Sequence, residues 1–340
     1  MATTIKALVP TVPPLFKRII SLFPHEYFRY CFAYGSGVFK QGDACGSNPM
    51  IDMIFVVDDP IGFHGQNVLW NPSHYSSVKY FGHNFISKIQ ELWPAKVYFN
   101  TLIPIREEGI LLKYGVVKSV DLIDDLYDWD YIYLSGRLHK PVLEVGVATG
   151  ELKSSLLQNL YNALHAALLI LPGCFTELQL YKTITALSYM GDFRMVIGEN
   201  KNKVNNIVEN QAIHFRHLYR PLLTNLGDYV AVPDGEAFDQ LCAQDMSSES
   251  RMYHLFQLPK TPQQALVKYW RSHGGKRKDT EDVLRDLSKN PDVGDMLLIC
   301  LRRIVFKSSC LQSIKGIITA GLSKSVAYSN SKINKMLKSK

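Results

Sequence analysis

The 340-residue chain lacks any long apolar run. Its best candidate, residues 166–171, is far shorter than the roughly 18–20 apolar residues that a bilayer-spanning helix needs. This absence argues against a transmembrane protein. The chain is long enough for two domains, each with its own core. Its 46% hydrophobic content is typical of a folded globular protein.

Cysteines at metal-binding spacing are also missing. The six cysteines include no C-x-x-C pair and show no regular spacing. This pattern disfavours structural zinc and a secreted disulfide scaffold. We therefore expect reduced thiols in an intracellular compartment, most of them filling space in the core.

Acidic residues are absent from the beginning of the chain. No acid precedes Glu26, and residues 1–25 mix apolar and basic side chains. Such a composition is typical of a mitochondrial targeting segment. Residues 15–23 fit equally well as the first helix of the fold, because Pro13 and Pro14 would interrupt a longer helix. The composition leaves both interpretations open.

The end of the chain also lacks acids. None follows Asp295, so residues 296–340 carry a charge of +9 and the first 295 residues carry −2. An anionic surface is the partner that this asymmetry indicates. One helical face of the segment is apolar, with Leu311, Ile314, Ile317, Ile318 and Leu322.

A basic amphipathic segment of this kind is typical of a helix that lies in a membrane interface. The alternatives are a helix packed on the protein's own core and an arm that binds nucleic acid. We favour the membrane over RNA, because an apolar stripe has no use on a duplex.

The sequence pattern changes between the first 150 residues and the rest of the chain. Up to about residue 140 the pattern is that of alternating strands and helices. From residue 151 it becomes helical: leucines recur every four positions over 152–168, and helical patterns continue over 177–190 and 204–218. The sequence therefore predicts an α/β domain with a mixed sheet over residues 1–150, followed by a mainly helical domain over 151–295 and a basic amphipathic membrane-binding segment over 296–340. The predicted strands are 28–34, 51–57, 97–103 and 115–122, and a helix is predicted over 81–92.

A turn of Gly35, Ser36 and Gly37 follows the first predicted strand. Glycines let backbone N–H groups approach phosphate oxygens, and a helix that begins there adds its positive end. The turn is neither a P-loop, since no G-K-[ST] follows, nor the hydrolase motif G-x-S-x-G, since residue 34 is Tyr. An ordinary strand-to-helix turn is the alternative, and the carboxylate on the next strand favours the phosphate site.

That carboxylate is Asp52, and Asp121 lies on a later predicted strand. Two carboxylates on adjacent strands can hold Mg²⁺ against a triphosphate. Nucleotidyl-transfer enzymes usually carry Asp-x-Asp here, but residue 54 is Ile. We therefore predict Asp52 and Asp121 as metal ligands, and these two with Ser36 as the catalytic residues.

Basic residues supply candidate phosphate contacts. Lys118 is assigned to nucleotide binding together with Gly35, Ser36 and Gly37, although on a strand it would face away from Asp121. A cationic cluster suited to the substrate phosphate follows the apolar residues 131–134. It consists of Arg137, His139 and Lys140. The alternative is a solvated turn before Pro141.

Seven short motifs carry a resemblance to a known family, over about residues 27–328. They span residues 34–39, 52–60, 71–75, 113–116, 134–141, 188–194 and 314–321. With these motifs the chain resembles the mitochondrial phosphatidate cytidylyltransferases, the translocator-assembly-and-maintenance type of CDP-diacylglycerol synthase. Asp192 and Arg194 belong to one of the motifs, and the resemblance leaves open whether they reach the active site.

The resemblance implies a nucleotidyltransferase domain followed by a winged-helix domain, peripheral on the matrix side of the mitochondrial inner membrane. It implies conversion of CTP and phosphatidic acid to CDP-diacylglycerol and pyrophosphate, on the route to cardiolipin, with Mg²⁺ and without nucleic acid. The nucleophile is an anionic phosphate monoester, so no general base is required, and none stands out. Two alternatives stay open: an RNA-directed nucleotidyltransferase, and a non-catalytic membrane tether or assembly factor.

Overall fold

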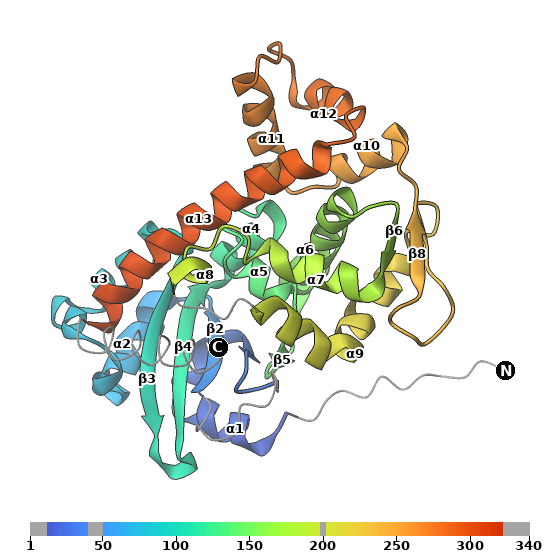
Figure 1. Ribbon diagram of the computed structural model, residues 1–340. Helices are drawn as coiled ribbons and strands as arrows, with labels where there is room; N and C mark the ends of the chain where they lie inside the picture. Colours follow the sequence, from blue (N-terminus) through green and yellow to red (C-terminus); the bar gives the residue numbers. More distant parts are fainter. Residues whose placement is uncertain (1–11, 40–49, 198–201, 322–340) are drawn as a thin grey trace.

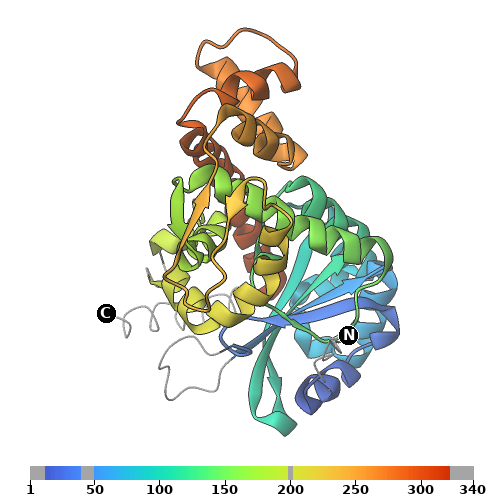
Figure 2. The same ribbon diagram turned by 90° about the vertical axis from the view of Figure 1, so that its right-hand side faces the viewer.

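The computed structural model describes residues 12–39, 50–197 and 202–321 (Figures 1 and 2). A five-stranded sheet organises the first domain, in the order β3-β4-β2-β1-β5. β2 and β4 pair in parallel and the remaining neighbours are antiparallel, so the prediction of a mixed sheet is confirmed. The strands are β1 (Phe28–Tyr34), β2 (Met50–Val57), β3 (Val97–Ile105), β4 (Ile110–Lys118) and β5 (Leu143–Glu144).

Helices cover both faces of this sheet (Figure 2). Met53 and Phe55 of β2 pack on one face with Phe63 of α2, while Ile54 and Val56 pack on the other. Strand side chains alternate between faces, so burial on both faces explains why β2 reads as a continuous apolar run. The helices of this domain are α1 (Pro14–Ser21), α2 (Pro60–Trp70), α3 (His83–Leu92), α4 (Ser119–Asp128) and α5 (Ser135–Leu138), with 3₁₀ turns η1 (His25–Tyr27), η2 (Pro72–His74), η3 (Ser77–Phe81) and η4 (Arg106–Glu108).

The first helix belongs to the fold. Phe16 and Ile19 of α1 are buried, and they join Phe23 in the core on one face of the sheet. Residues 14–21 therefore form the first helix of the fold, which was one of the two interpretations of the acid-free N-terminus. Residues 1–11 lie outside the described part of the chain.

One strand prediction is wrong in its second half. β4 ends at Lys118 and α4 begins at Ser119, so the segment predicted as a strand over 115–122 changes to a helix. Leu122 and Leu126, four residues apart, are both fully buried on α4. That i, i+4 spacing is helical, and it outweighs the short β-rich run that precedes it.

The second domain is mainly helical, as predicted. Its small antiparallel sheet has the strand order β6-β8-β7. Its elements are α6 (Gly150–Ile170), β6 (Cys174–Thr176), α7 (Glu177–Leu187), α8 (Arg194–Ile197), α9 (Lys203–Thr224), β7 (Val230–Ala231), β8 (Leu241–Gln244), α10 (Ser248–Phe256), α11 (Lys260–Ser272) and α12 (Thr280–Ser288).

A 28-residue helix, α13 (Val293–Ala320), runs from the α10–α12 group to β3 (Figure 1). It continues across the predicted boundary at residue 296. Its beginning packs Leu297 and Leu301 into the core of the second domain. Near its end Thr319 donates a hydrogen bond to the Phe99 carbonyl oxygen on β3, at 3.4 Å.

One face of this helix therefore packs on the protein itself, which was one of the three interpretations of the basic segment. Residues 322–340 lie outside the described part of the chain. Across the described ranges, no helix is both long enough and apolar enough to cross a membrane.

Candidate active site

A pocket lies where the sheet of the first domain meets the second domain and α13. Its lining comes from the turn after β1, from β2 and β4, from the segment around α5, and from α7 to α9 and α13. The polar and charged side chains in this lining are Tyr34, Ser36, Asp52, Lys113, Tyr133, Arg137, Lys140, Ser188, Tyr189, Asp192, Arg194, Lys203, Gln211, Ser308 and Ser309.

The Gly-Ser-Gly turn lies directly beside Asp52. β1 and β2 pair so that Tyr34 is opposite Asp52, and the chain turns at Gly35 with φ +84°. A Cβ at Gly35 would lie 3.3 Å from Asp52 Oδ2, and one at Gly37 would lie 2.5 Å from the Met50 carbonyl oxygen. The turn needs glycine at both positions. The structure thus brings Gly35, Ser36 and Asp52 together in the pocket lining, whereas Gly37 belongs to the turn but not to the lining.

Lys113 forms an ion pair with Asp52. β2 and β4 run in parallel with Asp52 and Lys113 in register, and Lys113 Nζ lies 3.7 Å from Asp52 Oδ1. The two side chains are 21% and 13% exposed respectively, so both still reach the pocket. The pair places one negative and one positive charge at the same edge of the sheet.

Arg137 enters the pocket against two tyrosine rings. Its Nη1 donates a 2.7 Å hydrogen bond to the Tyr133 carbonyl oxygen. Its guanidinium carbon lies 4.2 Å from the ring centroid of Tyr133 and 5.3 Å from that of Tyr34. Lys140 lies beside it, donating to Ser188 Oγ at 2.8 Å and to the Gly136 carbonyl oxygen. Two of the three predicted substrate-phosphate residues therefore line the pocket.

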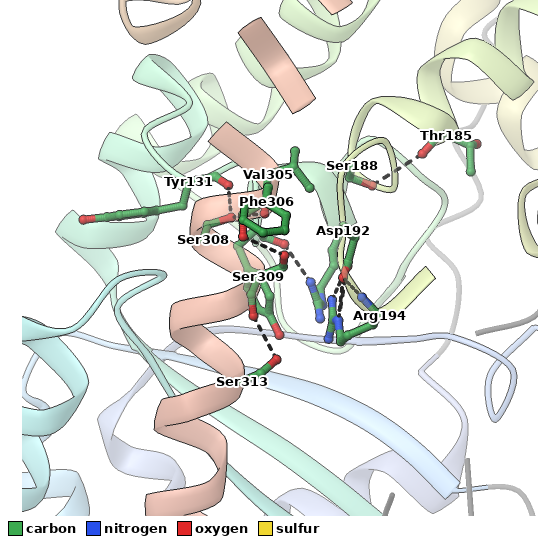
Figure 3. A network of polar contacts seen from close by, with 12 residues as sticks. Tyr131, Thr185, Ser188, Asp192, Arg194, Val305, Phe306, Ser308, Ser309 and Ser313 are labelled. Atoms are coloured by element: carbon green, nitrogen blue, oxygen red, sulfur yellow. Dashed lines mark hydrogen bonds and ion pairs between the residues drawn. The ribbon is translucent and has the colours of Figure 1, made fainter. Parts of the chain in front are cut away.

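Asp192 and Arg194 also reach the pocket, beside α13 (Figure 3). Asp192 is 4% exposed, and it accepts hydrogen bonds from the Arg194 backbone N–H at 3.0 Å and from Arg194 Nε at 2.9 Å. Ser308 on α13 donates to the Tyr131 carbonyl oxygen at 2.7 Å, which fixes this helix against the pocket wall.

The electrostatics of the pocket favour an anion. Burial opposes ionisation of Tyr133, but Arg137, Arg194 and Lys113 outweigh it and lower the pKa of Tyr133 to about 8. Burial, followed by repulsion from Arg137 and Lys203, holds the pKa of Lys140 well below its usual range. Two carboxylates, Asp52 and Asp192, face five basic side chains in the lining: Lys113, Arg137, Lys140, Arg194 and Lys203.

Asp121 and Lys118 lie at the opposite end of β2. Lys118 is in register with Val57, five residues from Asp52, which is about 17 Å along a strand. Asp121 lies in the first turn of α4, where Lys96 Nζ is 2.6 Å from its Oδ1. The premise that Asp121 follows on a strand is wrong, and neither residue lines the pocket.

His139 lies behind the pocket rather than in its lining. It is fully buried, with Nε2 3.1 Å from Asn159 Oδ1, and burial lowers its pKa to about 3. A neutral, enclosed imidazole of this kind orders the core. The assignment of His139 to a substrate phosphate therefore does not fit its position.

Several residues that line the pocket were not predicted from the sequence. Lys113 could have been found once β4 was paired in parallel with β2, because the register puts it opposite Asp52. On α13, Ser308 belongs to a polar stripe that faces inward, and only the packing of the helix reveals this. The stripe comprises Ser308, Gln312, Lys315 and Thr319. Tyr133 and Lys203 gave no recognisable pattern.

The oxygen ligands in the pocket fit a metal ion whose coordination shell the substrate phosphates would complete. The described residues contain no group of three or more His, Cys, Asp or Glu side chains that could hold an ion. Mg²⁺ is commonly bound by one or two carboxylates together with substrate phosphates. Asp52 and Ser36 both line the pocket, whereas the Asp192 carboxylate is engaged by Arg194.

A mixed sheet that presents Gly35, Ser36 and the neighbouring Asp52 to a basic pocket is the arrangement expected of a nucleotidyltransferase. A family model described as "Phosphatidate cytidylyltransferase, mitochondrial" matches residues 16–335. The chain belongs to this family, as the motifs indicated.

Curated proteins of that name align over almost the whole chain. The Xenopus laevis protein is 44% identical over 333 residues, which covers 95% of each chain. The Danio rerio protein is 43% identical over 325 residues, or 94% of each chain. The Drosophila melanogaster protein is 42% identical over 339 residues, covering 94% of this chain and 98% of its own.

Proposed function

We propose that this protein is a phosphatidate cytidylyltransferase that converts CTP and phosphatidic acid to CDP-diacylglycerol and pyrophosphate. The observation that carries the proposal is the basic pocket around the Gly-Ser-Gly turn and Asp52, found in a member of this family. Both substrates and both products are phosphate anions, and the basic side chains Lys113, Arg137, Arg194 and Lys203 in the lining match that charge.

In this reaction a phosphate oxygen of phosphatidic acid attacks the α-phosphorus of CTP. The new P–O bond forms as the bond to the β-phosphate oxygen breaks, and pyrophosphate leaves with the electron pair. The nucleophile is already an anion, so the chain needs to align two phosphates and offset their charge rather than abstract a proton. We assign this work to Lys113, Arg137 and Arg194, and we assign the triphosphate to the turn of residues 35–37.

We further propose Asp52 as the residue that holds Mg²⁺, with the Ser36 hydroxyl beside it. When bound, Mg²⁺ supplies positive charge against the triphosphate and the departing pyrophosphate. A single carboxylate in reach is enough when phosphate oxygens provide further ligands.

The wider setting of the enzyme is also a proposal. The relatives are named mitochondrial, and we propose a peripheral position on the matrix side of the inner membrane, on the route to cardiolipin. The helices and small sheet of the second domain support a winged-helix assignment. We expect no nucleic acid partner, because the basic side chains gather in one pocket that both domains line rather than along an extended surface.

One assay tests the activity. Purified protein is given labelled CTP and Mg²⁺ together with either phosphatidic acid vesicles or RNA. Label is expected in CDP-diacylglycerol, and label in RNA alone would overturn the proposal. A protein that labels neither substrate would favour a non-catalytic tether or assembly factor.

A further inference from the structure

Three aromatic side chains project from the end of η3 and the first turn of α3. Tyr80 is 82% exposed, Phe81 72% and Phe85 42%, and the rings of Phe81 and Phe85 lie 5.3 Å apart. Exposed aromatic side chains gathered in this way on a folded domain mark an interaction surface.

In the last turns of α13 the usual arrangement of an amphipathic helix is reversed: a polar residue is buried and apolar residues are exposed. Lys315 is fully buried, and its Nζ donates to the Trp93 carbonyl oxygen at 3.2 Å, while burial lowers its pKa to about 7. Ile314, Ile317 and Ile318 lie on the outside of the same turns, 44–49% exposed. The polar side of the helix thus faces the protein and its apolar side faces outward.

The segments that carry the two apolar groups are in contact with each other. Ser76, directly before η3, donates to the Ile318 carbonyl oxygen at 3.3 Å, and a Cβ at Gly321 would lie 3.4 Å from Ser76 Cβ. Figure 1 shows α3 beside this end of α13. We call the combined surface the wedge face; it consists of Tyr80, Phe81, Phe85, Ile314, Ile317 and Ile318.

We propose that the wedge face inserts into the headgroup region of an anionic bilayer and seats the enzyme there. The inference rests on the proposed function, because phosphatidic acid remains in the bilayer while its headgroup reacts. Apolar and aromatic residues on a basic background are the combination that binds such an interface.

The charges around the face favour a bilayer over a second copy of the chain. Two exposed lysines lie close to it along the helices: Lys88, three residues after Phe85 on α3, and Lys307, two turns before Ile314 on α13. No acid follows Asp295 in the sequence. The chain leaves the described structure at this face, and residues 322–340 carry five lysines. Two identical cationic surfaces would repel each other, whereas an anionic membrane attracts all of these charges.

The same helix connects the wedge face to the pocket. Ser309 lines the pocket and Ile317 lies eight residues further along α13, which corresponds to about 12 Å along the helix axis. A bilayer seated on the wedge face would therefore place lipid headgroups close to the pocket.

The test compares two matched variants of the full chain. In the wedge variant Tyr80, Phe81 and Phe85 are changed to Ser. In the control variant Leu157 and Ile213, which are 50% and 61% exposed on the second domain, are changed to Ser. Flotation with phosphatidylcholine vesicles that contain phosphatidic acid measures membrane binding. Turnover is measured on the same vesicles and on dispersed short-chain phosphatidic acid.

We expect the wedge variant to lose about tenfold or more in vesicle binding and in vesicle turnover, with unchanged turnover of the dispersed lipid. The control variant should match the wild type throughout. Wild-type binding by the wedge variant would overturn the inference, as would a sedimentation shift from dimer to monomer. A wild type inactive on both lipid forms would instead count against the proposed function.

Discussion

Asp52 and Lys113 are partners in the parallel register of β2 and β4, with Lys113 Nζ 3.7 Å from Asp52 Oδ1. The sheet therefore sets an acid and a base side by side at the edge where the Gly-Ser-Gly turn also lies. A metal ion bound with the triphosphate would bring further positive charge to this carboxylate, so the negative charge of Asp52 should matter more than its shape.

Asp52→Asn keeps the shape and removes the charge. We expect kcat/KM to fall by about 10²-fold or more, because an electrostatic contribution to the transition state is lost. Initial rates with labelled CTP and phosphatidic acid vesicles measure the change. Asp228→Asn, at an exposed acid outside the pocket lining, is the control and should retain wild-type rates. Equal rates for both variants would remove Asp52 from the proposed metal site.

For Asp121 we expect the opposite result, namely that loss of its charge leaves the activity unchanged. It lies on α4, remote from Asp52, and its Oδ1 is 2.6 Å from Lys96 Nζ. We expect Asp121→Asn to leave kcat and the Mg²⁺ requirement near wild type and to lower the free energy of unfolding by about 0.5–1 kcal/mol, the range of a partly exposed ion pair. Lys96→Met should have a similar effect on urea unfolding. A loss of activity as large as that of Asp52→Asn would restore Asp121 as a ligand.

Asp52, which lines the pocket, and Asp121, which does not, show what the local sequence can predict. The strands at 28–34 and 51–57 were recognisable because apolar runs end at turn residues, and the carboxylate of Asp52 follows the turn closely. Asp121 was misplaced because a short apolar run fits a strand and a helix equally well. Lys113 and Ser308 reach the pocket only through strand pairing and helix packing, which no local pattern specifies.

Only one face of the C-terminal segment could be predicted from the sequence, for a related reason. Periodicity identified an apolar face containing Ile314, Ile317 and Ile318, and these residues are indeed exposed. It could not reveal that the opposite face, with Lys315, is buried against the first domain. A lysine is expected at the surface, and only its partner on another element, the Trp93 carbonyl oxygen, explains its burial.

Tyr133 should make binding of CTP depend on pH. Three cations lower its pKa to about 8, so the phenol is neutral below that pH and anionic above it. A phenolate in the pocket would repel the triphosphate. We expect KM for CTP to rise above pH 8, by at most about tenfold per pH unit. Tyr133→Phe should abolish this rise and the matching tyrosinate absorbance change. A rise that persists in Tyr133→Phe would assign it to another group.

The segment that carries Tyr133 is strained and held by one buried carboxylate. Trp129 and Ile132 have φ of +57° and +51°, a conformation that costs of order 1–3 kcal/mol for such residues. Asp125 accepts backbone N–H bonds from Tyr131 at 2.8 Å, from Ile132 at 3.2 Å and from Ser135 at 3.0 Å. These bonds offset the strain, so Asp125 is a positioning residue for the pocket wall.

Asp125→Ala removes all three acceptor contacts at once. We expect the free energy of unfolding to fall by about 3 kcal/mol, since hydrogen bonds to a buried charge are lost. At a temperature where the variant is still folded, kcat should fall more than KM rises, because the misplaced wall affects alignment. Asp125→Asn keeps an acceptor oxygen and should partly rescue both. Asp124→Ala, at the exposed neighbouring acid, is the control. If Asp125→Ala were as stable and active as Asp124→Ala, the strained segment would be held by its packing alone.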